Sequence, residues 1–192
     1  NLNNSLVKYE TRKIKSEENT THYIAFYTDK KADYLDAVKV YFPVKYDYLI
    51  SALKTTFLYL IRNNIKATVK FHVKSTNEGI VIRFYNKKDV MPFINYCNNN
   101  FRLKELIVGL NPFIASIHGL GIVRDENIVN SYNGTLSKIL EEYFRLLKDS
   151  NSLDILDFLI KRISLEEDES IRFNIKAIES NVRAILNKEN PL

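Results

Sequence analysis

The sequence predicts an α+β fold: a small, mostly antiparallel sheet packed on helices, with a C-terminal helical extension. Two observations support this prediction. Short segments alternate apolar and polar residues, and longer segments repeat apolar residues about every 3.6 positions. The segments follow the order strand, helix, strand, turn, strand, helix, and helical patterns then dominate. This order favours helices gathered on one face of the sheet.

Each predicted strand has one apolar face. Residues 37–44 (AVKVYFPV), 67–74 (ATVKFHVK) and 80–85 (IVIRFY) all place apolar residues at every second position. The turn between the last two ends at Gly79, which can take a positive φ. A shorter strand is predicted at 22–27 (HYIAFY).

Five helices are predicted. The strongest pattern spans 47–63, and Asp47 can cap its first turn. A second helix begins near Asp89 and a third near Thr135. Two more close the chain, the last opening on a capping box at Ser164. The third helix is expected to bury Leu136, Ile139, Leu140, Tyr143, Phe144 and Leu147.

Three parts of the chain are expected. Residues 1–20 are polar and lack periodicity, which predicts a flexible lead-in. Residues 21–150 are long enough for one domain with its own core, and 151–192 form a helical extension packed on it. Within the domain, Gly and Pro mark 98–121 as the least regular stretch. Because the chain begins at Asn1, we expect a piece trimmed from a longer protein.

The composition is that of a globular protein with a positive excess. Of 192 residues, 45% are hydrophobic and 27% charged, and the net charge is +5. This charge is compatible with an anionic partner such as nucleic acid, an acidic membrane surface or a phosphopeptide. It is equally compatible with a positive excess that only keeps the protein soluble.

Several functional classes are excluded by residue usage. A single cysteine, Cys97, rules out an internal disulfide and a thiolate zinc site, and the three histidines lack metal spacing. No apolar run reaches the roughly 20 residues of a membrane span, and the chain shows no signal-peptide pattern. We therefore expect no metal site, no membrane partner and a cytoplasmic location.

The informative feature is a polar face shared by three strands. If the strands are neighbours, one face collects Lys39, Tyr41, Lys70, His72, Lys74, Arg83 and Tyr85. Crowded cations repel unless an anion compensates, and a phosphate dianion suits both Arg and Lys. Like charges also lower the pKa of a neighbouring ammonium group, which prepares a lysine to act as a base. Ordinary solvated side chains remain the alternative.

Residues 69–73 (VKFHV) resemble the KFH strand motif of the phosphothreonine lyase superfamily. That superfamily includes type III secretion effectors, and lyase domains and stand-alone effector-like lyases of lanthipeptide biosynthesis. The order of elements is similar over residues 33–148, ending in a Pro-Phe loop and a Gly-rich segment (NPFIASIHGLGIVRDE). The resemblance implies a β-elimination that uses no metal and no cofactor.

The resemblance also implies residue roles. Lys70 would remove the α-proton of phosphothreonine or phosphoserine, and protonated His72 would donate to the departing phosphate oxygen. Phosphate binding would fall to Lys39, Arg83, Tyr85, Arg124 and His118. The implied partners are a phosphorylated peptide or protein, with a kinase and a cyclase as separate or fused domains. The implied location is the bacterial cytoplasm, and secretion as an effector is compatible with the same resemblance.

Two other functions fit the same residues. A basic sheet face that bears Tyr41 and Tyr85 resembles surfaces that stack and neutralise single-stranded RNA, although we expect nucleic acid to be the weaker reading. An inactive lyase-like scaffold could instead bind a partner through its C-terminal helices. His22 is interpreted as a surface or core-edge residue, and Cys97 as a small buried hydrophobe.

Overall fold

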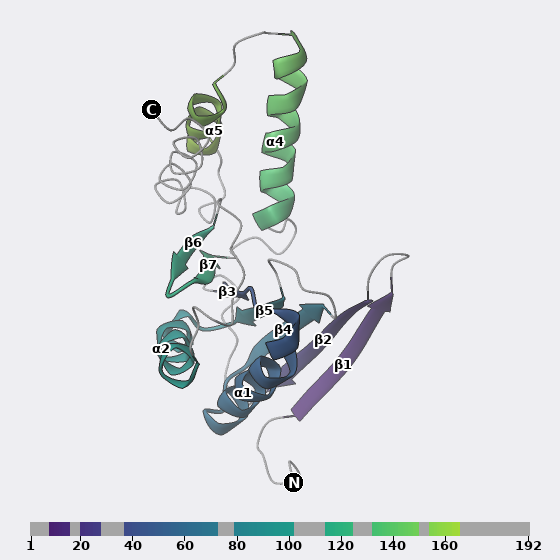
Figure 1. Cartoon of the computed structure of the whole chain (residues 1–192), viewed down its shortest axis with the longest axis vertical. Helices are drawn as coiled ribbons and strands as arrows, with labels where there is room; N and C mark the ends of the chain where they lie inside the picture. The colour runs from purple at the N-terminus through teal and green to yellow at the C-terminus, as the bar shows by residue number, and fades with distance from the viewer. Residues whose placement is uncertain are drawn as a thin grey trace. The chain divides into compact units, whose positions relative to one another are not determined.

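The computed structural model describes residues 8–15, 20–27, 37–72, 79–101, 114–124, 132–149 and 154–165. In chain order, the strands and α-helices are β1 (Lys8–Lys15), β2 (Thr20–Tyr27), β3 (Val38–Phe42), α1 (Leu49–Arg62), β4 (Ala67–His72), β5 (Ile80–Phe84), α2 (Val90–Asn100), β6 (Ala115–Ile117), β7 (Leu120–Arg124), α4 (Tyr132–Asp149) and α5 (Ile155–Ser164) (Figure 1). Short 3-10 turns precede α1 (Tyr46–Tyr48) and α2 (Lys87–Asp89).

The strands form one seven-stranded sheet in the order β1-β2-β4-β5-β3-β7-β6. The pairings β1–β2, β2–β4, β4–β5 and β5–β3 are all antiparallel. The predicted α+β fold, with an antiparallel sheet packed on helices, is therefore confirmed. The chain divides into two compact units, residues 1–111 with 116–122 and residues 112–115 with 123–192.

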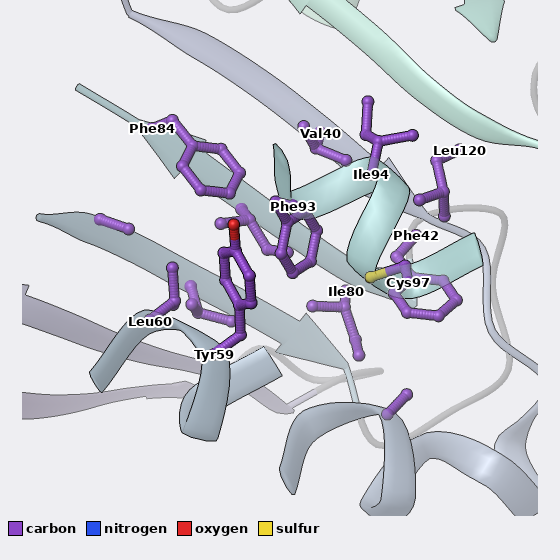
Figure 2. Packing of buried hydrophobic residues seen from close by; sticks show 14 of the residues in the cluster. Val40, Phe42, Tyr59, Leu60, Ile80, Phe84, Phe93, Ile94, Cys97 and Leu120 are labelled. Atoms are coloured by element: carbon purple, nitrogen blue, oxygen red, sulfur yellow. The ribbon is translucent and has the colours of Figure 1, made fainter. Parts of the chain in front are cut away.

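Helices α1 and α2 pack against one face of the sheet. The apolar sides of β3, β4 and β5 share a buried cluster with both helices. The ring of Phe93, on α2, is fully buried and lies 5.4 Å from the ring of Tyr59 and 5.3 Å from that of Phe84 (Figure 2). Burial of one strand face forces the alternate residues of the same strands onto the other face.

The start of α1 differs from the prediction. Asp47 lies in the 3-10 turn, and the residue at the N-cap position, Tyr48, makes no side-chain capping hydrogen bond. The Ser51 hydroxyl instead donates to the Tyr48 carbonyl at 2.9 Å. The expected cap at Asp47 is wrong because the extra turn moves the helix start two residues along the chain. By contrast, α2 begins directly after Asp89, as expected.

Position 79 leaves little room for a side chain. The φ of Gly79 lies outside the positive range that the sequence suggested. A Cβ added to it would lie 3.1 Å from the Val44 carbonyl oxygen and 3.2 Å from the Val44 nitrogen. The chain leaving β3 thus passes so close to the start of β5 that a side chain would displace backbone.

Residues 8–15 form a strand where the sequence predicted a flexible lead-in. Every residue of β1 is in register with a residue of β2, from Lys8 opposite Tyr27 to Lys15 opposite Thr20. β1 lies at the edge of the sheet and carries four cations and one carboxylate. Edge strands commonly carry charges that discourage pairing with other chains, so this strand lacks the apolar alternation that reveals inner strands.

The stretch 98–121 is more regular than predicted. α2 extends to Asn100, and β6 and β7 are neighbouring strands joined by the two-residue turn His118-Gly119. Both turn residues have positive φ, 52° and 82°, as a type I′ hairpin turn requires. The glycine that suggested a loop therefore closes a hairpin.

In the second unit, α4 buries only part of the predicted stripe. Leu136, Ile139 and Tyr143 are buried, whereas Phe144 is 57% exposed and Leu147 36% exposed. Phe144 directly follows Tyr143, and a step of one residue turns about 100° around a helix, so the two cannot share one narrow face. The predicted burial of Phe144 and Leu147 is wrong.

α4 and α5 contact each other within this unit. The ring of Tyr143 lies 5.4 Å from that of Phe158, and Arg162 Nε donates to a Glu142 carboxylate oxygen at 2.8 Å. The compact units therefore group α4 with α5, whereas the sequence placed residues 132–149 in the domain 21–150. The predicted final helix, from Ser164 with its capping box, falls almost wholly outside the described residues.

Replacement of Phe93 should show how far the fold depends on the helix-covered core. Phe93→Ala should lower the free energy of unfolding by about 3–5 kcal/mol, because it leaves a cavity between Tyr59 and Phe84. Met91→Ala, on the same helix but 43% exposed, should change it by less than about 0.5 kcal/mol. Urea unfolding followed by circular dichroism measures both, and equal effects would contradict this packing.

The thiol of Cys97 should be inert in the folded protein. Burial raises its pKa from 9.0 to about 12. At pH 8 it should react with a disulfide reagent at least about tenfold more slowly than in urea. The stability that the neutral thiol contributes is present below about pH 9 and is lost as the pH rises towards 12. The stability difference between the native protein and Cys97→Ala should narrow over that interval, and a constant difference would contradict it.

Candidate active site

Strand register brings predicted site residues to one face of the sheet. Lys39 on β3 lies directly opposite Arg83 on β5, and Arg83 lies opposite Thr68 on β4. Lys70 and His72 follow Thr68 at intervals of two residues, so they occupy the same face. We call this the outer face, because it is opposite the face that α1 and α2 cover.

Tyr85 joins this set through Thr68. Directly after β5, its hydroxyl lies 2.9 Å from Thr68 Oγ1, a distance that fits a hydrogen bond. The Arg83 guanidinium carbon lies 5.6 Å from the centroid of the Tyr85 ring, which is within cation–π range. Two nitrogens of Arg83, Nε and Nη2, are buried. The guanidinium therefore packs against the sheet instead of extending into solvent.

The outer face is less exposed than the sequence suggested. Tyr41, expected on an open polar surface, is only 3% exposed, and Val81, directly opposite it, is 7% exposed. Val81 is also opposite Lys70. Lys39, Lys70, His72, Arg83 and Tyr85 are half-buried. A charged group is less screened in such a setting than on a fully solvated strand, so an anion held there interacts more strongly.

Two of the predicted phosphate-binding residues are not brought to this face. His118 is exposed in the β6–β7 turn, where its positive φ gives it a conformational role. Arg124 ends β7 and alternates with Leu120 and Ile122, which pack with the helix-side core. Lys74 lies outside the described residues, because β4 is described only to His72.

His22 lies on the helix-side face. Its ring stacks on that of Phe71 at 5.0 Å with an interplanar angle of 10°, and Phe71 packs against the core. The interpretation of His22 as a core-edge residue is therefore confirmed. Cys97, interpreted as a buried hydrophobe, is fully buried on α2.

The sequence analysis missed Thr68, although the signal for it was present. Thr68 precedes Lys70 by two residues in the same alternating strand, so alternation alone places it on the polar face. Its contact with Tyr85 could not be foreseen, because it depends on the register between β4 and β5. The register also places Thr21 opposite His72 and Tyr23 opposite Lys70.

No family model, curated protein or solved structure matches this chain. Among the described residues, no three His, Cys, Asp or Glu side chains are grouped in a way that could hold a metal ion. Nor does any helix in the described part of the chain have the length and apolar character needed to cross a membrane.

The register gathers three cationic side chains on the outer face. Directly opposed residues on neighbouring strands have Cβ atoms about 5 Å apart, and residues two apart on one strand are separated by about 7 Å. Lys39 and Arg83 are therefore close neighbours on the outer face, and Lys70 lies on β4 diagonal to Arg83. His72 lies two residues beyond Lys70 on the same strand, so an amine and an imidazole lie on the same face as the pair Lys39 and Arg83.

The bond between Thr68 and Tyr85 should have a measurable energy. Tyr85→Phe and Thr68→Val should each lower the free energy of unfolding by about 1 kcal/mol, and the double variant should lose less than the sum. Tyr46→Phe, at a residue 54% exposed, serves as the control and should have no effect. Strict additivity in urea unfolding would show that the two hydroxyl groups do not interact.

Proposed function

We propose that the protein is a lyase that eliminates phosphate from phosphothreonine or phosphoserine in a peptide or protein. The observation that supports this most is the strand register. It places Lys70 and His72 on the same half-buried face as the directly opposed pair Lys39 and Arg83. The resemblance of residues 69–73 to the KFH motif supports the same reaction.

In the proposed reaction, Lys70 acts as the base and His72 as the acid. The neutral Lys70 amine takes the α-proton, and the electron pair of that bond forms the Cα–Cβ double bond. The Cβ–O bond breaks, and the departing phosphate oxygen takes a proton from the His72 imidazolium. The products are a dehydroamino acid and free phosphate. Transfer of a proton from Lys70 to His72, through solvent, restores both groups.

The other residues would hold the phosphate. Lys39 and Arg83 would offset the charge that develops as the phosphate leaves, which is the usual role of fixed cations in such a step. Thr68 and Tyr85 would keep Arg83 in place through the hydroxyl contact and the ring beneath the guanidinium. Tyr85 is thus assigned beside Arg83 rather than directly to the phosphate.

The chemistry suggests a place in peptide maturation. A lyase of this kind requires a kinase that phosphorylates Thr or Ser, and its dehydroamino acid product is suited to attack by a thiol in a cyclase. We propose lanthipeptide-type maturation in a bacterial cytoplasm as the setting. The kinase and the cyclase would be separate partners or fused domains.

The outer face is poorly arranged for stacking RNA bases. Tyr41 is buried, so its ring offers little surface to a base. The ring of Tyr85 lies beneath Arg83, and its hydroxyl meets Thr68. The two tyrosines that would form a stacking platform are therefore already engaged in the fold, and peptide chemistry is the better supported function.

The reaction is tested with a phosphothreonine peptide in the presence of a chelator. Mass spectrometry should show loss of phosphoric acid and formation of a dehydroamino acid. Lys70→Ala should lower the rate by about 100- to 10,000-fold, because proton abstraction loses its base. Lys54→Ala, at an exposed position on α1, removes the same charge on the helix side and should leave the rate unchanged.

Two results would contradict the proposed function. One is recovery of free threonine, which indicates hydrolysis rather than elimination. The other is undiminished elimination by Lys70→Ala, with circular dichroism showing that the variant is folded.

A further inference from the structure

Helix α4 carries an exposed apolar stripe. Phe144 is 57% exposed, Leu147 is 36% exposed, and Leu140 is half-buried. Residues three and four positions apart lie on the same side of a helix, so these three side chains are neighbours on α4. We call this stripe the Phe144 flank. Exposed aromatic and aliphatic side chains gathered in this way commonly mark a surface that binds another protein.

Helix α5 packs on another side of α4. The ring of Phe158, on α5, lies 5.4 Å from the ring of Tyr143. Arg162, also on α5, forms an ion pair with Glu142. One residue turns about 100° around a helix, so Tyr143 and Glu142 lie about 100° and 160° away from Phe144. The contacts between the two helices therefore leave the Phe144 flank uncovered.

Two charged residues of opposite sign border this flank. Glu141 directly follows Leu140 and Lys148 directly follows Leu147, and both charged side chains are exposed. They are seven positions apart, about two turns of helix, so they lie along the same edge of the flank. Within the described part of the chain, neither of them has an ion pair. The edge is therefore negative at one end and positive at the other.

An edge of this kind is complementary to itself when two copies are antiparallel. A two-fold axis that passes between residues 144 and 145 brings Glu141 to the level of Lys148 of the second copy, because the two residues are equally far from that point. The same axis keeps the charged edges of both helices on one side of the pair. In a parallel pair the charged edges would lie on opposite sides, and Glu141 could not meet Lys148.

We propose that the Phe144 flank binds a second copy of this chain in an antiparallel helix pair. The two Phe144 rings would meet near the axis, and each Glu141 would pair with Lys148 of the other copy. The helices would overlap over residues 140–149, about 15 Å of helix. Such a contact buries less than the roughly 1,200 Å² of a stable interface, so we expect a weak dimer with a Kd on the order of 100 µM. This association goes beyond the proposed function and does not depend on it.

Sedimentation equilibrium of the full chain, from about 10 µM to about 1 mM, measures the Kd of the dimer. The variants are Phe144→Gln, Glu141→Lys, Lys148→Glu, and the double variant with both charge reversals. Leu146→Gln is the matched control, because Leu146 is 41% exposed on the same helix but lies about 160° away from Phe144.

Phe144→Gln should raise the Kd at least about tenfold, because it removes the apolar centre of the contact. Each single charge reversal should raise it at least about fivefold, because two attractive contacts become repulsive. The double variant should return to within about twofold of the native Kd, since opposite charges face each other again. Leu146→Gln should leave the Kd unchanged.

A native protein that remains monomeric over the whole concentration range would overturn the proposal. A double variant that stays as weak as the single reversals would also overturn it, because the charges would then not pair across antiparallel helices. Equal weakening by Leu146→Gln would exclude the Phe144 flank as the contact. Urea unfolding at low protein concentration tests a different occupant. Phe144→Gln should leave the midpoint unchanged, and a marked decrease would show that a segment of the same chain covers the flank, which would overturn the proposal.

Discussion

The burial of one sheet face beneath α1 and α2 determines the rest of the first unit. Phe84 and Phe93 meet in that buried layer, together with Tyr59. Because side chains alternate along a strand, burial of Val69 and Phe84 places Lys70 and Arg83 on the other face. A slip of one residue would bury the cations and expose the apolar residues, and this penalty holds the register in place.

The cations of the outer face are arranged by cross-strand pairing rather than by proximity in sequence. Lys39 and Arg83 are 44 positions apart in the chain, yet they are directly opposite in the sheet. Like charges on directly opposed strand residues repel each other. Burial of the neighbouring Tyr41 reduces the solvent available to screen that repulsion. Under the proposed function, the phosphate dianion of the substrate would bind beside this pair of cations.

Strand alternation and helical periodicity made much of this architecture predictable. Lys39, Lys70, His72 and Arg83 were assigned to one face correctly because each sits in a strand with a strong apolar pattern. β1 was not predicted because a charged edge strand has no such pattern. The burial of Tyr41 was not predicted because residues far away in the sequence decide which parts of a sheet face are covered. The roles of Arg124 and His118 came from a linear order of elements, which does not fix strand faces.

The close approach of Gly79 to Val44 has a consequence for the proposed acid. The Gly79 carbonyl accepts a hydrogen bond from the His72 backbone nitrogen at 3.2 Å. The backbone that carries the imidazole is therefore bonded to a residue at which an added Cβ would lie unusually close to the backbone of Val44. A side chain at position 79 would press on the backbone of Val44, and the resulting shift would reach the position of His72 through this hydrogen bond.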